Sequence, residues 1–321
     1  MPYHPDAPFS VHIRPVLPSQ LPEKEPLRIL IVPDLHIPLG KPQKTWLLQD
    51  RKWLDAHDWV VLLGDMTACY GTPGEYRQVN GFISELARPY SVVNGNHEFS
   101  FSPCEDGSAD YGRKWEHSSR RVQQSQLERF EAFYQIGSRF AAHRSALAGF
   151  CLLGIDSIGD GSSGLLSSKH EAWFEDVLDT MCDVPLLVFC HFPLITGVMD
   201  SIRYYEEGRK PYYLARKEVR ARLAQRTHPT FWFSGHVHFR PPHPFLAPYL
   251  TEDRVWQIHC PDSWGFGRPD NENWRPQHYD GLFVRTIELD HRHLRVITTD
   301  LVHRTVISDD EFPLFRGECG P

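Results

Sequence analysis

Histidine, aspartate and asparagine side chains gather in five short motifs of the sequence, and each motif follows an apolar run. The motifs are Asp34-Leu35-His36, Gly64-Asp65, Gly95-Asn96-His97-Glu98, His191 and Gly235-His236-Val237-His238. Their side chains supply imidazole nitrogens and hard carboxylate or amide oxygens, and none supplies a thiolate. This donor set suits Mn, Fe, Zn or a mixed pair better than a structural zinc site. A single histidine would be read as a core residue, but five such motifs predict a metal centre.

A pair of buried carboxylates needs a counter-charge. If Asp34 and Asp65 lay close together, each would raise the cost of ionising the other. Two divalent cations would remove that cost. The residues therefore predict a pair of divalent metal ions as the cofactor.

The elements that must position these motifs can be read from the apolar pattern. Buried strands are predicted over residues 27–32, 59–65, 90–96, 150–156, 185–191 and 230–236. Helices are predicted over 44–58, 74–89, 118–136 and 167–181, the last with Ser167 or Ser168 as N-cap, and a hairpin over 281–301. This alternation predicts an α/β layered fold. In such folds ligands bind outside the carboxyl ends of strands, so the five motifs are expected to converge in one crevice.

Glycines precede three of the motifs, at Gly64, Gly95 and Gly235. Glycine permits a sharp turn and a close approach of the backbone to an ion or a phosphate. His236 and His238 alternate, and in an extended chain they would point to the same side and serve two adjacent metals. The prolines that follow, 241–242, would then turn the chain away.

The whole chain of 321 residues carries 41% hydrophobic residues and a net charge of −7. No block of five basic residues occurs, so long nucleic acid is not favoured as a partner. No apolar run is long enough to span a membrane, and the N-terminus lacks the layout of a secretion signal. The seven cysteines are scattered without a CxxC pair, which indicates reduced thiols and a cytoplasmic protein.

The domain organisation follows from these patterns. Residues 1–26 are Pro-rich and predict an extended arm, and residues 27–321 predict one domain. Loop insertions are expected near residues 99–150, 197–217 and 261–280. The last two are rich in polar and aromatic residues, and they could form a lid over a substrate or a contact in an oligomer, whose size the sequence leaves open.

The five motifs, in this order, resemble those of the calcineurin-like metallophosphoesterase superfamily over about residues 27–240. The resemblance implies a four-layer sandwich, in which two mixed β-sheets are flanked by helices. It implies that one metal is held by Asp34, His36 and His238 and the other by Asn96, His191 and His236. Asp65 would bridge both metals, and His97 would act as the acid or as a stabiliser of the transition state.

The chemistry implied by the resemblance is hydrolysis of a small phosphoester. Two metals lower the pKa of a shared water from ~15.7 towards ~7, and the resulting bridging hydroxide would attack the phosphorus in line. Asp65 would hold the metals for this step. Proton transfer from His97 to the departing oxygen is worth ~10²–10⁴ in rate.

A second, weaker resemblance narrows the substrate. Asp156, Ser157, Gly164, Leu165 and Trp173 stand in a pattern that is similar to the class III cyclic nucleotide phosphodiesterases and their relatives. It favours a phosphodiesterase acting on a nucleotide or a similar small molecule. Cys190 and Glu98 depart from that pattern, so a phosphomonoesterase or a nuclease of the same fold stays open as an alternative. A non-catalytic scaffold with a retained metal site is a further alternative.

Overall fold

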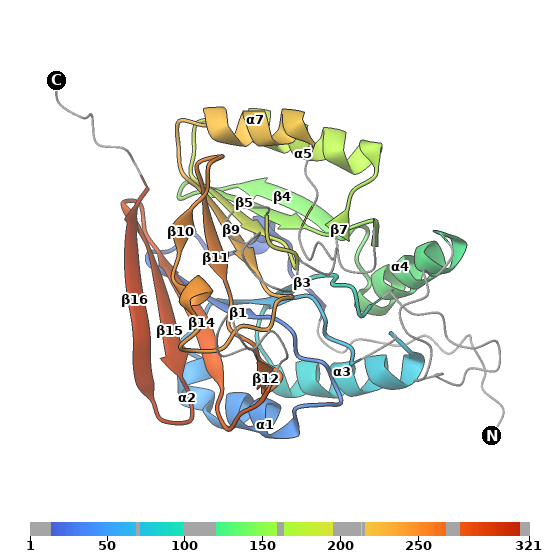
Figure 1. The fold of residues 1–321 in the computed structure, drawn as a ribbon. Helices are drawn as coiled ribbons and strands as arrows, with labels where there is room; N and C mark the ends of the chain where they lie inside the picture. Colours follow the sequence, from blue (N-terminus) through green and yellow to red (C-terminus); the bar gives the residue numbers. More distant parts are fainter. Residues whose placement is uncertain are drawn as a thin grey trace.

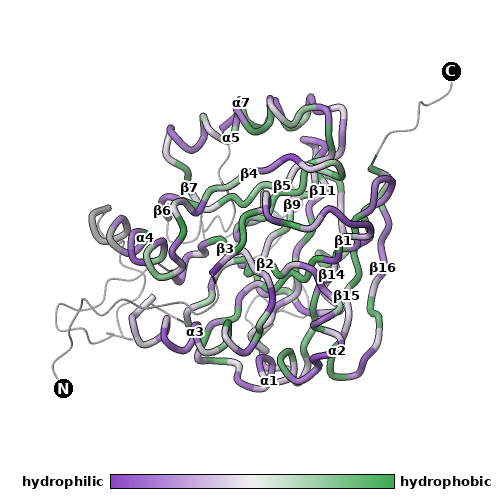
Figure 2. The backbone as a smooth tube through the Cα atoms, turned by 180° about the vertical axis from the view of Figure 1, so that it is seen from behind, coloured by the Kyte–Doolittle hydropathy of each residue, from purple (hydrophilic) through white to green (hydrophobic). Residues whose placement is uncertain are grey.

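Two six-stranded mixed β-sheets form the centre of the molecule (Figure 1). The computed structural model describes residues 14–68, 71–98, 120–158, 164–194, 213, 216–267 and 277–314. Apolar side chains from the facing sides of both sheets, such as Ile29 and Phe233, pack in one cluster between them. Figure 2 shows that the strands in the middle of the molecule are hydrophobic, as strands buried on both faces must be.

The first sheet has the strand order β16-β15-β14-β1-β2-β3. Its parallel half comprises β1 (Leu27–Val32), β2 (Trp59–Leu63) and β3 (Tyr90–Val93). Its antiparallel half comprises β14 (Phe283–Leu289), β15 (His293–Asp300) and β16 (Thr305–Pro313). All five residues of β2 are buried, because helices cover this half of the sheet on the side away from the core.

The second sheet has the order β10-β11-β9-β8-β5-β4. Its four inner strands are parallel and are β5 (Gly149–Leu153), β8 (Leu186–Phe189), β9 (Thr230–Ser234) and β11 (Val255–His259). The antiparallel edge strands are β4 (Phe140–Arg144) and β10 (Tyr249–Leu250). Two small two-stranded sheets add β6 (Ser157–Ile158) with β7 (Gly164–Leu165), and β12 (Phe266–Gly267) with β13 (Gln277–His278).

Helices form the two outer layers (Figure 1). On the side of the first sheet lie α1 (Lys41–Gln49), α2 (Arg51–Leu54) and α3 (Pro73–Leu86), and on the side of the second lie α5 (Ser168–Thr180) and α7 (Lys217–Gln225). Helix α4 (Arg120–Tyr134) contributes Phe130 and Tyr134 to the apolar cluster of the first outer layer. Short 3₁₀ turns occur at Pro18–Gln20 and Pro244–Leu246. The predicted four-layer arrangement of two mixed sheets between helices is confirmed.

Several elements differ from the sequence-based expectation. The helix predicted over 44–58 breaks at Asp50, whose side chain accepts a hydrogen bond from the backbone nitrogen of Trp53 and begins α2 as its N-cap. The predicted hairpin is present as β14 and β15, but β16 adds a third strand. Strands β4 and β11 were also not predicted. Ser167 is the N-cap of α5, as one of the two alternatives held.

The described part of the N-terminal segment contacts the first sheet. The backbone nitrogen of Val16 donates to the carbonyl oxygen of Tyr90 at 2.6 Å, beside the edge strand β3. Among the described residues, no helix is long and apolar enough to cross a membrane.

Candidate metal centre

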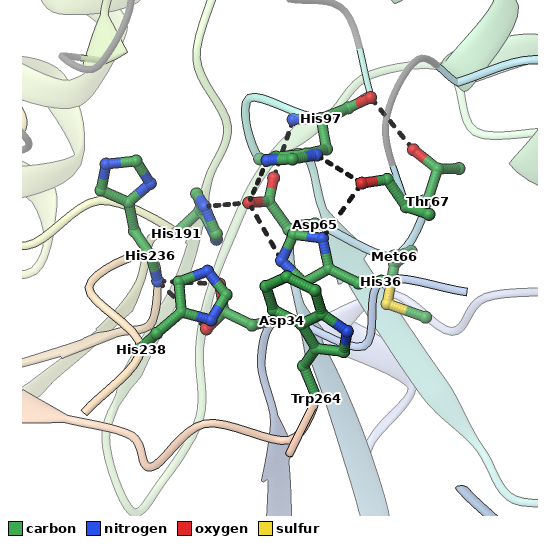
Figure 3. A network of polar contacts seen from close by, with 12 residues as sticks. Asp34, His36, Asp65, Met66, Thr67, His97, His191, His236, His238 and Trp264 are labelled. Atoms are coloured by element: carbon green, nitrogen blue, oxygen red, sulfur yellow. Dashed lines mark hydrogen bonds and ion pairs between the residues drawn. The ribbon is translucent and has the colours of Figure 1, made fainter. Parts of the chain in front are cut away.

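Six of the seven predicted ligands lie together at the carboxyl ends of strands from both sheets (Figure 3). They form two groups, and Asp65 belongs to both. Within each group the potential ligand atoms lie within 4.8 Å of one another. The groups are Asp34, His36, Asp65 and His238, and Asp65, His191 and His236. The seventh residue, Asn96, is buried in the same loop as His97. The convergence that was predicted from strand ends is therefore present.

The backbone of these loops is bent sharply at the ligand residues. Five of them have a positive φ: Asp34 (53°), His36 (44°), Asp65 (50°), His236 (67°) and His238 (51°). The left-handed region is uncommon for residues other than glycine. The prediction that His236 and His238 share one side of an extended chain was wrong, because a turn and not a strand carries them. The turn nevertheless directs His236 to one group and His238 to the other.

The imidazole rings are oriented through their Nδ1 atoms. Nδ1 of His36 lies 3.3 Å from the carbonyl oxygen of Ala68, and Nδ1 of His191 lies 2.8 Å from that of Leu63. A carbonyl oxygen only accepts, so each Nδ1 carries a hydrogen, and in the neutral ring Nε2 is the atom left to donate an electron pair. This is the tautomer that a metal ligand needs.

Asp65 lies at the centre of the site. Its Oδ2 atom lies 3.2 Å from Nε2 of His191 and 3.8 Å from Nε2 of both His36 and His97. Burial alone would raise the pKa of this carboxyl, but the imidazoles of His191, His97 and His36 hold it well below its usual value. Burial acts to lower the pKa of His191, and the Asp65 carboxylate reverses this and raises it to about 9.

Asp34 and His36 show that the site fits cations. Both side chains are buried, and burial raises the pKa of Asp34 to about 6 and lowers that of His36 well below its ordinary value. Nε2 of His36 is buried and has no hydrogen-bond partner in the described part of the chain. A buried nitrogen lone pair beside two carboxylates is costly without a partner and is satisfied by a metal ion.

His97 stands at the edge of the cluster. Its Nδ1 atom lies 2.7 Å from the carbonyl oxygen of Ala68, the same atom that orients His36, and its backbone nitrogen donates to Oδ1 of Asp65 at 2.8 Å. The side chain is 18% exposed, whereas that of Asp65 is 1% exposed. Burial lowers the pKa of His97, and the neighbouring Asp65 acts in the opposite direction.

Glu98 holds the loops that carry the ligands. The buried carboxylate accepts hydrogen bonds from the backbone nitrogens of four residues at 2.7–3.1 Å: Asp65, Met66, Thr67 and Gly95. Burial, and then the nearby Asp65, raise the pKa of Glu98 to about 7.

Asp262 is a candidate site residue that the sequence analysis missed. Its side chain is buried, and Oδ1 lies 2.6 Å from Nδ1 of His238. A carboxylate in this place holds the histidine in the tautomer that presents Nε2 to a metal and raises its basicity. The signal that could have found it is its position, because Asp262 follows β11 as the other motifs follow their strands.

Two glycines allow neighbouring loops to approach the ligands. A Cβ atom on Gly95 would lie 2.2 Å from Oδ1 of Asp65, and one on Gly235 would lie 2.5 Å from Oδ2 of Asp34. No side chain fits at such distances. At both positions the close approach is to a candidate ligand side chain, and the predicted approach to an ion or a phosphate stays a prediction.

Each of the two loops that were considered as lids is described only in part. Of the loop expected near 197–217, only residues 213, 216 and 217 lie within the described part of the chain, the last at the start of α7. Tyr213 itself is buried and stacks on Trp232, with ring centroids 5.5 Å apart, so this residue belongs to the core. The loop expected near 261–280 is described up to Gly267 and again from Gln277, and its first part contacts the candidate ligands His36 and His238.

A sequence profile of the calcineurin-like phosphoesterases matches residues 27–240. No curated protein matches the sequence of this chain.

Solved structures share the fold at low sequence identity. A purple acid phosphatase, PPD1 from yellow lupin (Lupinus luteus) seeds, is 14% identical with a TM-score of 0.55, and the alignment covers 91% of this chain and 54% of that one. The chain thus spans about half the length of this phosphatase. PhoD is 12% identical with a TM-score of 0.56, covering 93% and 72%. GAP50, the anchor in the inner membrane complex of Plasmodium, is 12% identical with a TM-score of 0.52, covering 92% and 91%.

Proposed function

Because the chain belongs to the calcineurin-like phosphoesterase family, we propose that it is a metal-dependent phosphodiesterase that hydrolyses a small, nucleotide-like phosphodiester. The observation that carries this proposal is that two groups of ligand-type side chains share Asp65. Shared carboxylates are what a two-metal site requires, since the two ions must lie within a few ångströms of one another.

The proposed ligand sets follow the two groups, with Asn96 added to the second on the strength of the family resemblance. Asp34, His36 and His238 would hold one ion, and Asn96, His191 and His236 would hold the other, with Asp65 between them. When bound, such a pair of ions acidifies water and takes up charge from phosphoryl oxygens. We leave the metals as Mn, Fe, Zn or a mixed pair, because imidazole with carboxylate and amide oxygen suits each of them.

His97 is proposed to assist the departure of the alcohol. Nδ1 is occupied by the carbonyl oxygen of Ala68, so a proton delivered to the substrate must come from Nε2. The ring is the more exposed neighbour of Asp65, which places it where a substrate can reach it. Burial lowers the pKa of His97 and the Asp65 carboxylate opposes this shift, so the proposed role as acid, or as a hydrogen-bond donor to the leaving oxygen, depends on that carboxylate.

The preference for a diester rests on the second resemblance. Asp156 accepts hydrogen bonds from the backbone nitrogen of Ser167 at 2.7 Å and from Nδ1 of His170 at 2.6 Å, and so it fixes the start of α5. Asp156, the first residue of the second resemblance, thus has a structural role outside the metal centre. The resemblance alone does not decide between a diester and a monoester, and the experiment below compares the two.

The location is also proposed. Cys151, Cys182, Cys190 and Cys260 are free thiols. Burial raises the pKa of Cys151, Cys190 and Cys260, which keeps these thiols protonated and unreactive. Free thiols suit the reducing cytoplasm that the sequence predicts.

The test is hydrolysis by metal-free protein that is reconstituted with Mn, Fe, Zn or Mg. Bis-p-nitrophenyl phosphate and p-nitrophenyl phosphate are compared at equal concentrations, with Asp65→Asn as the inactive control. The proposal expects metal-dependent cleavage, faster for the diester. Faster cleavage of the monoester would replace it with a phosphatase, and two bound metals without cleavage of either ester would replace it with a scaffold.

A further inference from the structure

The ring of Trp264 lies beside the candidate metal centre on the side of His36 and His238, and the ring of Phe266 packs against Trp264. The indole of Trp264 lies 4.6 Å from the His36 ring, tilted by 35°, and 5.5 Å from the His238 ring (Figure 3). The ring of Phe266 follows at 5.1 Å from that of Trp264. Trp264 and Phe266 are partly exposed, whereas His36, which Trp264 contacts, is buried. We call Trp264 and Phe266 the aromatic wall.

The aromatic wall is held in place by the carboxylate that also orients a predicted ligand. Oδ2 of Asp262 accepts hydrogen bonds from the backbone nitrogens of Trp264, Gly265 and Phe266 at 3.1, 2.8 and 3.1 Å. Its other oxygen bonds His238. One buried side chain therefore sets the distance between the wall and the metal ligands, so the wall is organised before a substrate arrives.

Gly265 adds a second constraint. It has a φ of +86°, and a Cβ atom there would lie 2.2 Å from Nε2 of Gln43. The backbone thus passes close to α1 between the two aromatic residues. The large apolar side chains on either side of Gly265 both stay partly exposed, so they bury less surface than they would in the core.

We propose that the aromatic wall is a subsite that stacks a planar ring of the substrate, a nucleobase or an aryl group, beside the phosphoryl group. The proposal deepens the function proposed above and rests on it for the phosphoryl part of the substrate. Stacking on an aromatic side chain is tolerant of ring identity because every base has a π-face. The wall would therefore select phosphoesters that carry a ring over those that carry only an alkyl group, without reading one base.

The test uses phosphonates, because a phosphoesterase does not cleave their P–C bond. Phenylphosphonate and methylphosphonate are titrated by calorimetry into the metal-loaded protein, together with the 5′-phosphonate analogue of AMP. The proposal expects phenylphosphonate or the nucleoside analogue to bind about tenfold more tightly than methylphosphonate, as one stacked ring contributes. Which of the two binds better distinguishes an aryl ring near phosphorus from a base one sugar away.

Matched variants assign the preference to the wall. Trp264→Leu should abolish the preference for the ring, and Trp264→Phe should restore most of it. Trp256→Leu is the control, since Trp256 is also partly exposed but packs on Phe312 in β16. The metal content of each variant is also measured. A loss of metal would show that the substitution displaced His36, rather than only removing the stacking of the substrate ring on Trp264.

The outcomes separate this proposal from the proposed function. Equal binding of all three phosphonates to the parent protein, or a ring preference that survives in Trp264→Leu, would overturn the subsite. A ring preference that depends on Trp264, in a protein that cleaves neither chromogenic ester, would support the subsite while the proposed function fails.

Discussion

Asp262 and His238 are joined by a hydrogen bond of 2.6 Å between a carboxylate and an imidazole that are 24 residues apart in the sequence. Asp262→Asn should lower metal affinity about 10–100-fold, the usual effect of losing a partner that orients a ligand. The amide oxygen of the asparagine can still accept the hydrogen bond from His238. The amide NH₂ group then faces the backbone nitrogens of the aromatic wall, which lose their acceptor. The measurement is metal content after dialysis against a graded chelator. Unchanged metal retention would contradict the role of Asp262.

His97→Ala should reduce turnover by ~10²–10⁴ while the metal content stays at the level of the parent protein. The ring contacts Asp65 only at 3.8 Å and is not among the proposed ligands. The loss should be smaller for a p-nitrophenol leaving group, which departs without a proton, than for an alkyl alcohol. Rates measured with both kinds of ester check this, and equal losses for both would argue against proton donation.

Gly95→Ala should remove metal binding and activity together. The added Cβ atom would lie 2.2 Å from Oδ1 of Asp65, so the proposed bridging carboxylate must move. Gly81→Ala in α3 is the matched control, since its Cβ atom would meet nothing within 4 Å. In a helix interior this change stabilises by up to ~1 kcal/mol and should leave activity as it was. Metal analysis and thermal unfolding of both variants decide the matter.

The buried His57 ring should lower the free energy of unfolding as the pH falls into the mildly acidic range. Its ring is buried, with Nε2 at 2.9 Å from Oγ1 of Thr286, and burial lowers its pKa to about 4. The unfolded chain takes up the proton near pH 6.5, before the folded one does. The contribution is therefore complete above pH 6.5 and is lost as the pH falls towards 4, by about 3 kcal/mol.

The measurement for His57 is the free energy of unfolding in urea between pH 4 and pH 7. His57→Asn should show a shallower decline across that window than the parent protein. Parallel curves for the two proteins would mean that other groups cause the acid sensitivity.

The candidate ligands could be predicted because each of the five motifs comes directly after a strand of its own. A buried run such as 59–63 fixes where the chain reaches the edge of the sheet, and the next polar residue must lie there. The same rule would have found Asp262 if β11 had been recognised. Glu98 could not be assigned in this way, because its partners are backbone nitrogens of another loop, which leave no trace in residue types.

The missed elements have physical reasons of their own. Asp50 ends a helix in the middle of an apolar pattern that continues on both sides of it, so periodicity alone favours one long helix. Strand β16 is an edge strand with mostly exposed residues, such as Val306 at 61%, and its Asp309 and Asp310 hide the usual apolar alternation. Edge strands depend on pairing with a neighbour that local sequence does not reveal.

The left-handed backbone of the ligand residues has a consequence for directed evolution. A residue other than glycine in this conformation costs about 1 kcal/mol or more, and His236 and His238 are partly exposed, so their loss would leave no closed cavity. Without metal, glycine in place of His236 should give a more heat-resistant protein, whereas at His238 the gain is opposed by the loss of the hydrogen bond to the buried Asp262 carboxylate. A library selected for heat resistance in chelator would therefore discard His236 first, whereas selection in excess metal would retain it, since a bound ion stabilises the folded chain.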